Sequence, residues 1–464
     1  MSTPVGLTIP DTAHAVSVSL PKWSDNVGYE EGDQKIIKAM KGGYPRFVFH
    51  PTVKKLFNYC LNQFGTESES VLILNSRDAC LECRQFIKRQ TNSPTLKIRL
   101  VELLVQGSNL TKKSNVPKLY IILFPENVSG TAKQFWQHTG TGISSRFAEF
   151  CLFELEIERS FYRNQSKPCT GPSDVKSHKS LSREFDEQLQ TNTINREQSV
   201  FLEERFGRNL DVSLVSEARI TLKKRIAGVL GDAIDDSEMS KIEMNRSSNE
   251  ICENHVFLFP SGMSAIYYSH QITLALYPGL KSVQFGFPYI DTLKLQEKFG
   301  SGCIFYGFGE DNDLNELKTL LQTTHISALY CEFPSNPLLV SPPIKELWEL
   351  ANKFNFILII DETIGNFVNI NVLPYCHMLV SSLTKIFSGD SNVMGGSLVV
   401  NPNTSMTTKI MEFVNRSYRD LVWHDDVLFL ERNSRRFHSR IDIINRNAET
   451  ICDLLCNHPK GFCF

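Results

Sequence analysis

Short apolar runs alternate with amphipathic stretches along the second half of the chain. The apolar runs lie at residues 256–259, 283–285, 304–306, 326–331 and 356–360. Between them, apolar positions recur at helical spacing, which predicts helices over residues 265–276, 292–299, 314–322 and 344–353. Alternation of this kind is typical of a largely parallel, doubly wound sheet with helices on both faces. The pattern therefore predicts an α/β fold for this part of the chain.

A lysine lies in a polar, glycine-rich loop between two further apolar runs, residues 378–380 and 397–400. Lys385 is flanked by Ser382 and Thr384 and has no carboxylate beside it in the sequence. An amine must lose its proton to attack an aldehyde, and desolvation favours that loss. A solvated loop lysine is the alternative. Asp361 ends an apolar run upstream, and a lysine with an aspartate for a pyridinium nitrogen is the minimal protein contribution to pyridoxal phosphate (PLP) chemistry.

Several polar residues follow predicted strands directly. Ser261-Gly262-Met263 opens a predicted helix, where free backbone N–H groups and the helix dipole favour a phosphate. A simple helix cap is the alternative interpretation of that motif. Tyr289, Glu332 and Asp361 also come just after predicted strands. Ligands of doubly wound sheets bind at the carboxyl ends of the strands, so we expect a site there.

The first half of the chain predicts a smaller α/β layer. We expect strands at residues 47–49, 71–74 and 119–124, and helices at 33–40, 81–88 and 147–158. The predicted organisation is an N-terminal α/β extension (1–162), a polar linker (163–198), an arm and helix with a polar insert (199–254), a large PLP-binding domain (255–430) and a helical remnant (431–464). The remnant is expected to begin with one long helix over residues 431–444.

Composition excludes several classes of function. The chain has 464 residues and a formal net charge of -2, which gives no electrostatic basis for binding nucleic acid or an anionic membrane. No apolar run approaches the roughly 18 residues that span a bilayer, and the first residues lack the pattern of a secretory signal. We expect a cytoplasmic protein, with the nucleus as a further location. Of twelve cysteines only Cys80 and Cys83 are closely spaced, and we expect two thiols on a helix surface and no metal site.

Residues 381–396 resemble the lysine segment of the Cys/Met-metabolism PLP-dependent enzymes, and motifs in the family's order extend from about residue 205 to residue 400. The N-terminal part, with its GYEEG and GGYPRF stretches, resembles the extension of fungal cystathionine γ-synthases. The resemblance implies a fold type I PLP-dependent transferase, with a large domain like that of aspartate aminotransferase. It also implies PLP held as a Schiff base on Lys385.

The resemblance assigns expected roles to the other matching residues. Asp361 pairs with the pyridine nitrogen, Tyr289 stacks on the ring and assists proton transfer, and Asn336 of the Glu332-to-Pro337 motif contacts the phenolic oxygen. Thr363 lies against the ring face. The remaining expected contacts are to the cofactor phosphate, and they come from Ser261, Gly262, Met263, Ser382, Thr384 and, across a subunit interface, Arg208.

Three positions depart from the family pattern. Ile290-Asp291 stands where many members have two glycines, Glu362 replaces the usual asparagine, and Phe206 replaces a tyrosine. A phenylalanine cannot donate a hydrogen bond, so one phosphate contact is lost. Past residue 400 we find no match to the family's arginine that clamps the substrate carboxylate. We therefore expect a C-terminal domain that is missing or truncated.

The resemblance implies transsulfuration in methionine and cysteine metabolism. The expected reaction is γ-replacement in an O-acylhomoserine by cysteine, which gives cystathionine. A cystathionine γ-lyase type of activity is one alternative, because the family reactions use the same residues. A catalytically silent PLP-binding paralogue or interaction protein is the other. Arg208 acting across an interface implies a homodimer or homotetramer, or a hetero-oligomer with a full-length relative.

Overall fold

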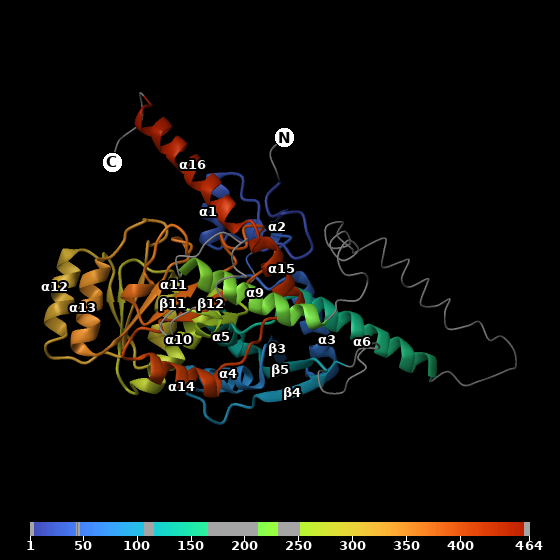
Figure 1. The fold of residues 1–464 in the computed structure, drawn as a ribbon. Helices are drawn as coiled ribbons and strands as arrows, with labels where there is room; N and C mark the ends of the chain where they lie inside the picture. The colour runs from blue at the N-terminus through green and yellow to red at the C-terminus, as the bar shows by residue number, and fades with distance from the viewer. Residues whose placement is uncertain are drawn as a thin grey trace, which may run out of the picture. The chain divides into compact units, whose positions relative to one another are not determined.

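The computed structural model describes residues 4–42, 44, 47–105, 116–165, 212–230 and 251–458 (Figure 1). Arg208, Phe206 and most of the predicted polar linker and polar insert lie outside the described residues. The chain divides into two compact units. Unit 1 comprises Met1–Lys133, Gly142–Glu217 and Trp423–Asp425. Unit 2 comprises Gln134–Thr141, Ala218–Val422 and Asp426–Phe464.

Unit 1 contains a three-stranded antiparallel sheet in the order β3-β5-β4 and a two-stranded antiparallel pair, β1 with β2. Its strands are β1 (Thr8–Ile9), β2 (Ser17–Val18), β3 (Glu69–Leu74), β4 (Arg99–Leu104) and β5 (Lys118–Pro125). Its helices are α1 (Trp23–Glu30), α2 (Gln34–Ala39), α3 (Pro51–Phe64), α4 (Arg77–Gln90) and α6 (Ser145–Gln165), with the short turn η2 (Glu126–Val128). The α/β layer expected for this region is therefore present, with antiparallel strands.

Two expectations for unit 1 were wrong, and one strand was not predicted. Residues 47–49 form no strand, because they lead straight into α3, which His50 caps at Thr52 and Pro51 begins. Strand β4 was not predicted, since its charged residues break the apolar pattern. Cys80 and Cys83 lie on the buried face of α4 and not on its surface, and burial raises the pKa of both thiols.

Unit 2 is built on a seven-stranded sheet in the order β6-β12-β11-β10-β9-β7-β8. Its strands are β6 (Val256–Phe259), β7 (Ser282–Phe285), β8 (Cys303–Tyr306), β9 (Ala328–Glu332), β10 (Ile357–Asp361), β11 (Met378–Ser381) and β12 (Gly396–Val400). All pairs are parallel except the two that β12 makes, with β6 and with β11. This confirms the largely parallel sheet.

Helices cover both faces of this sheet. The helices and short turns of unit 2 are η4 (Glu253–His255), α10 (Gly262–Leu276), α11 (Ile290–Lys298), α12 (Asp311–Leu320), α13 (Ile344–Phe354), η5 (Leu373–Tyr375), α14 (Thr407–Ser417) and α16 (Phe437–Cys456). Helices α5 (Ser129–Thr139), α9 (Val212–Leu230) and α15 (His424–Ser434) have residues in both units. None of the described helices is both long and apolar enough to cross a bilayer.

The main core of unit 2 lies between the sheet and α10. Alternate strand residues, such as Ile357 and Ile359 of β10, face α10, while Leu358 and Ile360 are buried on the opposite face, on which α13 packs. Because both faces are covered, the central strands are continuous apolar runs. Helix α10 is itself buried along most of its length, and the polar residues Ser269, His270 and Thr273 are buried among its apolar ones.

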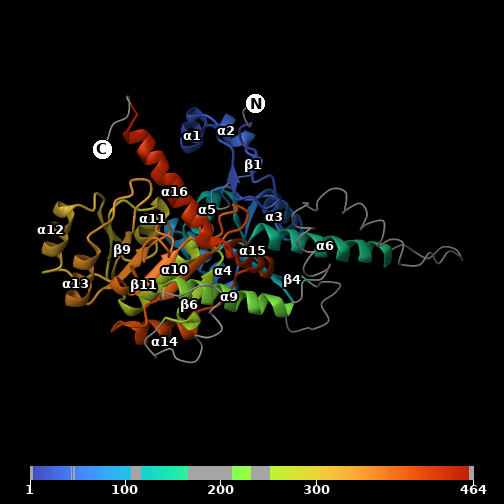
Figure 2. The same ribbon diagram turned by 45° about the horizontal axis from the view of Figure 1, so that its top comes forward.

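The long helix expected over residues 431–444 is instead two helices. Helix α15 ends at Ser434 and α16 begins at Phe437, with Arg436 at φ -105° between them. No glycine or proline marks this break, so the sequence pattern could not show it. Only Phe437 and Ile441 of α16 are buried, and the helix runs outward from unit 2 in both views (Figures 1 and 2).

Candidate active site at the carboxyl edge of the sheet

Six strands of unit 2 end at one edge of the sheet. All strands except β12 run in one direction, since β12 is antiparallel to both of its neighbours and the other pairs are parallel. The edge therefore brings together Ser261 after β6, Tyr289 after β7, Glu332 and Asp361 at the ends of β9 and β10, and Ser382 after β11. These are residues that the sequence placed after strands, and the fold gathers them at one edge.

The N-terminus of α10 faces the turn after β11. Ser261 caps the helix, with its Oγ accepting a hydrogen bond from the Ser264 N–H at 3.1 Å. A Cβ added at Gly262 would lie 2.8 Å from the Cβ of Ser382, so glycine allows this close approach. Among the described residues, no group hydrogen-bonds the buried Oγ of Ser382. A helix N-terminus beside an unsatisfied buried hydroxyl is suited to a phosphate group.

A short segment from the first half of the chain completes this part of the site. The Gly140 carbonyl accepts hydrogen bonds from Ser264 Oγ at 2.7 Å and from Ser261 Oγ at 3.4 Å. Gly140 has φ +65°, and a Cβ there would lie 2.4 Å from Ser261 Oγ, so the position requires glycine. No sequence pattern indicates this contact, because it joins residues more than a hundred positions apart.

Asp361 is connected to Ser382 through Thr363. The Thr363 backbone N–H and hydroxyl both donate to Asp361 Oδ1, at 3.0 and 2.6 Å, and the Ser382 N–H donates to Thr363 Oγ1 at 2.8 Å. Burial raises the pKa of Asp361 in spite of the two hydrogen bonds from Thr363, which lower it. Thr363 thus ties the end of β10 to the start of the lysine turn.

Glu332 lies beside Asp361 at the end of the neighbouring strand. Its Oε1 accepts a hydrogen bond from the Tyr289 N–H at 2.5 Å and its Oε2 accepts one from the Asn336 N–H at 3.2 Å. Burial, with a further contribution from the negative charge of Asp361, raises the pKa of Glu332 to about 8. Sequence reasoning noted the position of Glu332 but gave it no role. The indication in the sequence was that Glu332 ends a predicted strand, as Asp361 does.

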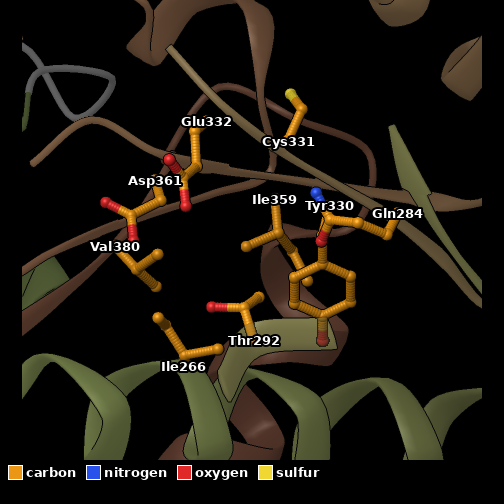
Figure 3. A pocket seen from close by; sticks show the side chains of 9 residues that line it. All are labelled: Ile266, Gln284, Thr292, Tyr330, Cys331, Glu332, Ile359, Asp361 and Val380. Carbon is orange, nitrogen blue, oxygen red and sulfur yellow. The ribbon is translucent and has the colours of Figure 1, made fainter. Parts of the chain in front are cut away.

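A small cavity lies beneath these two carboxyl groups (Figure 3). Its volume is about 10 Å³, which admits about one water molecule. The lining residues are Ile266, Gln284, Thr292, Tyr330, Cys331, Glu332, Ile359, Asp361 and Val380. Figure 3 shows the carboxyl groups of Glu332 and Asp361 side by side at one end of the cavity.

Lys385 lies in a compact turn after β11 and is exposed. Its N–H donates to the Ser382 carbonyl at 3.3 Å, and its own carbonyl accepts from the Gly389 N–H at 2.8 Å. The Thr384 hydroxyl closes the loop: it donates to the Gly395 carbonyl at 3.2 Å and accepts from the Gly395 N–H at 3.1 Å. The Thr384 hydroxyl is therefore engaged within the loop, and its expected phosphate contact stays a prediction.

Two departures from the family pattern have local explanations. Asp291, in place of a glycine, is buried, and its carboxylate accepts a hydrogen bond from Gln137 Nε2 at 3.2 Å and bonds His138 Nδ1 at 3.0 Å. Glu362 is also buried, and its Oε2 accepts the Phe367 N–H at 2.6 Å. Burial raises the pKa of Glu362 well above its usual range, which favours the protonated form of this side chain. Both residues are parts of the fold around the site.

The described residues contain no group of three or more His, Cys, Asp or Glu side chains that could hold a metal ion. A parallel-sheet edge with a phosphate-suited helix start, a half-buried aspartate and a lysine turn defines a PLP-dependent enzyme of fold type I.

Comparison with known proteins gives the family. Residues 247–461 match the model of the Cys/Met metabolism PLP-dependent enzymes, and residues 52–144 match the N-terminal domain of fungal trans-sulfuration enzymes. The chain is 41% identical to cystathionine gamma-synthase of Neurospora crassa, over 98% of this chain and 80% of that protein. It is 40% identical to a cystathionine gamma-synthase-like enzyme of Amanita muscaria, over 98% and 76%. With cystathionine gamma-synthase of Saccharomyces cerevisiae it shares 34% identity, over 97% and 80%.

The chain belongs to the Cys/Met-metabolism family of PLP-dependent enzymes. The family and the fold type expected from the sequence are thereby confirmed. The site residues fit the cofactor, because an unsatisfied Ser382 hydroxyl faces the start of α10 and a half-buried aspartate with a raised pKa lies at the end of β10.

Proposed function

We propose that this chain catalyses the γ-replacement reaction of cystathionine γ-synthases, in which an O-acylhomoserine and cysteine give cystathionine and a free carboxylate. The observation that carries the proposal is the single sheet edge that gathers Ser261, Tyr289, Asp361 and the turn of Lys385. The relatives named above support the choice of reaction, since two of them are called cystathionine gamma-synthase.

The two ends of the cofactor would be held by separate groups. Backbone N–H groups of Ser261, Gly262 and Met263 would hold the phosphate, with help from the hydroxyl of Ser382. The Thr384 hydroxyl would have to turn from the Gly395 carbonyl to donate to the phosphate as well. Asp361 would pair with the pyridine nitrogen. Asp361 is partly desolvated, which makes its ionised form less stable and raises its pKa. The positive charge of a protonated pyridine nitrogen would stabilise that ionised form.

The ring and the reacting atoms would be held by three further residues. Tyr289 would lie against the ring, and the Asn336 amide would donate to the phenolic oxygen. Bound PLP supplies an electron sink for the substrate's Cα. The Nζ of Lys385 would carry the cofactor covalently and, when released, move protons at the reacting carbons, with the Tyr289 hydroxyl assisting.

Assembly and location remain part of the proposal. Arg208 is proposed to reach the phosphate of a neighbouring subunit, so at least a dimer is required. The arginines of the C-terminal helices have other partners in unit 2: Arg435 pairs with Glu431 at 2.6 Å, and Arg440 binds the lysine turn. We propose a cytoplasmic enzyme.

The first experiment is the visible absorption spectrum of the purified chain with added PLP, beside a Lys385→Ala variant. We expect a yellow band in the parent chain alone. The second step is turnover of an O-acylhomoserine with cysteine, followed as cystathionine. A parent that binds PLP but forms no cystathionine supports the silent-paralogue alternative. Net release of cysteine from cystathionine would favour the γ-lyase alternative.

A further inference from the structure

Two carboxylic acids end neighbouring parallel strands at the same register. Asp361 of β10 and Glu332 of β9 are direct partners in the sheet, so their side chains leave the same face at the same level. Figure 3 shows the two carboxyl groups side by side, above Thr292 and Ile266. Two anions this close in a partly buried place repel each other strongly.

Glu332 holds two backbone segments that carry proposed cofactor contacts. Its Oε1 takes the Tyr289 N–H at 2.5 Å, at the start of α11, and its Oε2 takes the Asn336 N–H at 3.2 Å, in the loop after β9. The carboxyl group of Asp361 instead accepts hydrogen bonds from the N–H and hydroxyl of Thr363. Different donors therefore hold the two acids in place. Of the two, Glu332 is the one whose hydrogen bonds position Tyr289 and Asn336.

The surroundings add little other charge near pH 7. Burial raises the pKa values of Tyr330 and Cys331 of β9. It also raises the pKa of Glu362, directly after β10, and so favours the uncharged form of all three groups. The other lining residues of the cavity, from α10, β7, α11 and β11, do not titrate. After burial, the negative charge of Asp361 is the main influence that raises the pKa of Glu332.

We propose that Glu332 is a positioning residue that holds Tyr289 and Asn336 around the cofactor ring, and that it releases its proton to solvent when the ring nitrogen binds at Asp361. The inference rests on the proposed function only in requiring PLP at this edge. Burial and the charge of Asp361 raise the pKa of Glu332 to about 8, so the acid is mostly neutral at pH 7 before binding. A pyridinium cation beside the pair favours both ionised forms and lowers that pKa.

The test compares the parent chain with Glu332→Gln in PLP binding without substrate. Gln has the same shape and no titratable proton, and its amide nitrogen cannot accept one of the two N–H groups. We expect PLP affinity to fall about tenfold, as for the loss of one buried hydrogen bond. Calorimetry in two buffers of different ionisation enthalpy counts the protons exchanged. The parent is expected to release up to about one proton more than the variant, with an affinity that rises more steeply with pH.

Two further variants separate positioning from folding. Glu332→Asp keeps the acid but is one methylene shorter, so it should lose affinity while still exchanging a proton, and it serves if Glu332→Gln fails to fold. Glu362→Gln is the control for a buried acid beside Asp361. Its side chain bonds the Phe367 N–H and the Ser381 side chain, and not the segments of Tyr289 and Asn336, so the variant should match the parent in PLP affinity. Equal affinity, or equal proton counts in the parent and Glu332→Gln, would overturn the inference. A parent that takes up no PLP would instead overturn the proposed function, and this inference with it.

Discussion

Arg440 of α16 holds the turn that carries Lys385. Its Nη1 donates to the carbonyls of Ile386 and Phe387, each at 3.1 Å, and its Nη2 donates to the Asn433 carbonyl at 3.0 Å. An ion pair with Asp390 at 3.6 Å adds little, because Asp390 is 46% exposed. The Arg440 side chain is only 23% exposed, so water does not readily replace it. We therefore expect Arg440→Ala to loosen the lysine turn.

The magnitude follows from these bonds. A hydrogen bond to a charged group contributes about 1.5–3 kcal/mol, and three such bonds set an upper limit that partial solvation of the turn reduces. We expect the free energy of unfolding to fall by about 2–3 kcal/mol. In urea this corresponds to a midpoint lower by roughly 1 M. Arg440→Lys should recover part of the loss, since a lysine has the charge but not the planar fork of donors.

The assay has two parts, urea unfolding and the rate at which the visible band forms after PLP is added. Arg440→Ala should lower the midpoint and slow the formation of the band. Arg446→Ala is the control, because Arg446 lies on the same helix and its Nε donates only to the Asp442 carbonyl of its own turn. An Arg440→Ala chain that unfolds at the parent's urea concentration and reacts at the parent's rate would refute this reasoning.

Two further predictions concern the phosphate cradle and the pH dependence of stability. Gly262→Ala puts a Cβ 2.8 Å from the Cβ of Ser382, so PLP affinity should fall at least tenfold. Equilibrium dialysis measures this affinity. An undiminished affinity would contradict the proposed phosphate site at the start of α10. His377 is buried, accepts the Leu358 N–H on its Nδ1 at 3.0 Å, and has a pKa that burial lowers to about 4. In the unfolded chain this histidine takes up its proton near pH 6.5, whereas in the folded chain it does so only near pH 4. Its contribution to the free energy of unfolding is therefore complete above pH 6.5 and falls by about 3 kcal/mol as the pH is lowered to 4. Urea unfolding at pH 5, 6 and 7 should show a weaker pH dependence for His377→Gln, and an unchanged slope would count against a neutral buried imidazole.

Much of the site could be predicted from local sequence. The central strands are continuous apolar runs because both faces of the sheet are covered, and such runs are visible without a structure. Polar residues directly after those runs, such as Ser261 and Asp361, had to lie at one edge, because the carboxyl ends of parallel strands meet there. The resemblance of the lysine segment to a known family predicted PLP as the cofactor. The match of residues 247–461 to the Cys/Met metabolism PLP-dependent enzymes agrees with that prediction.

Other features depend on contacts between distant parts of the chain. The break between α15 and α16 has no glycine or proline, and it occurs where Asn433 binds Ser388 and Asn392 of the lysine loop. Strand β4 carries charges on its exposed positions and is held in place by pairing with β5. Neither pairing leaves a periodic pattern in the sequence, so neither could be predicted.

The sequence by itself determined the order of strands and helices in unit 2 and the residues at the strand ends. Only the tertiary structure decided which of those residues meet. Strand register placed Glu332 against Asp361, and chain folding placed the Gly140 carbonyl on the hydroxyls of Ser261 and Ser264. The physical reason is that apolar periodicity shows, within one short segment, which positions are buried. Strand register and loop contacts instead depend on the packing of residues that lie far apart in the chain.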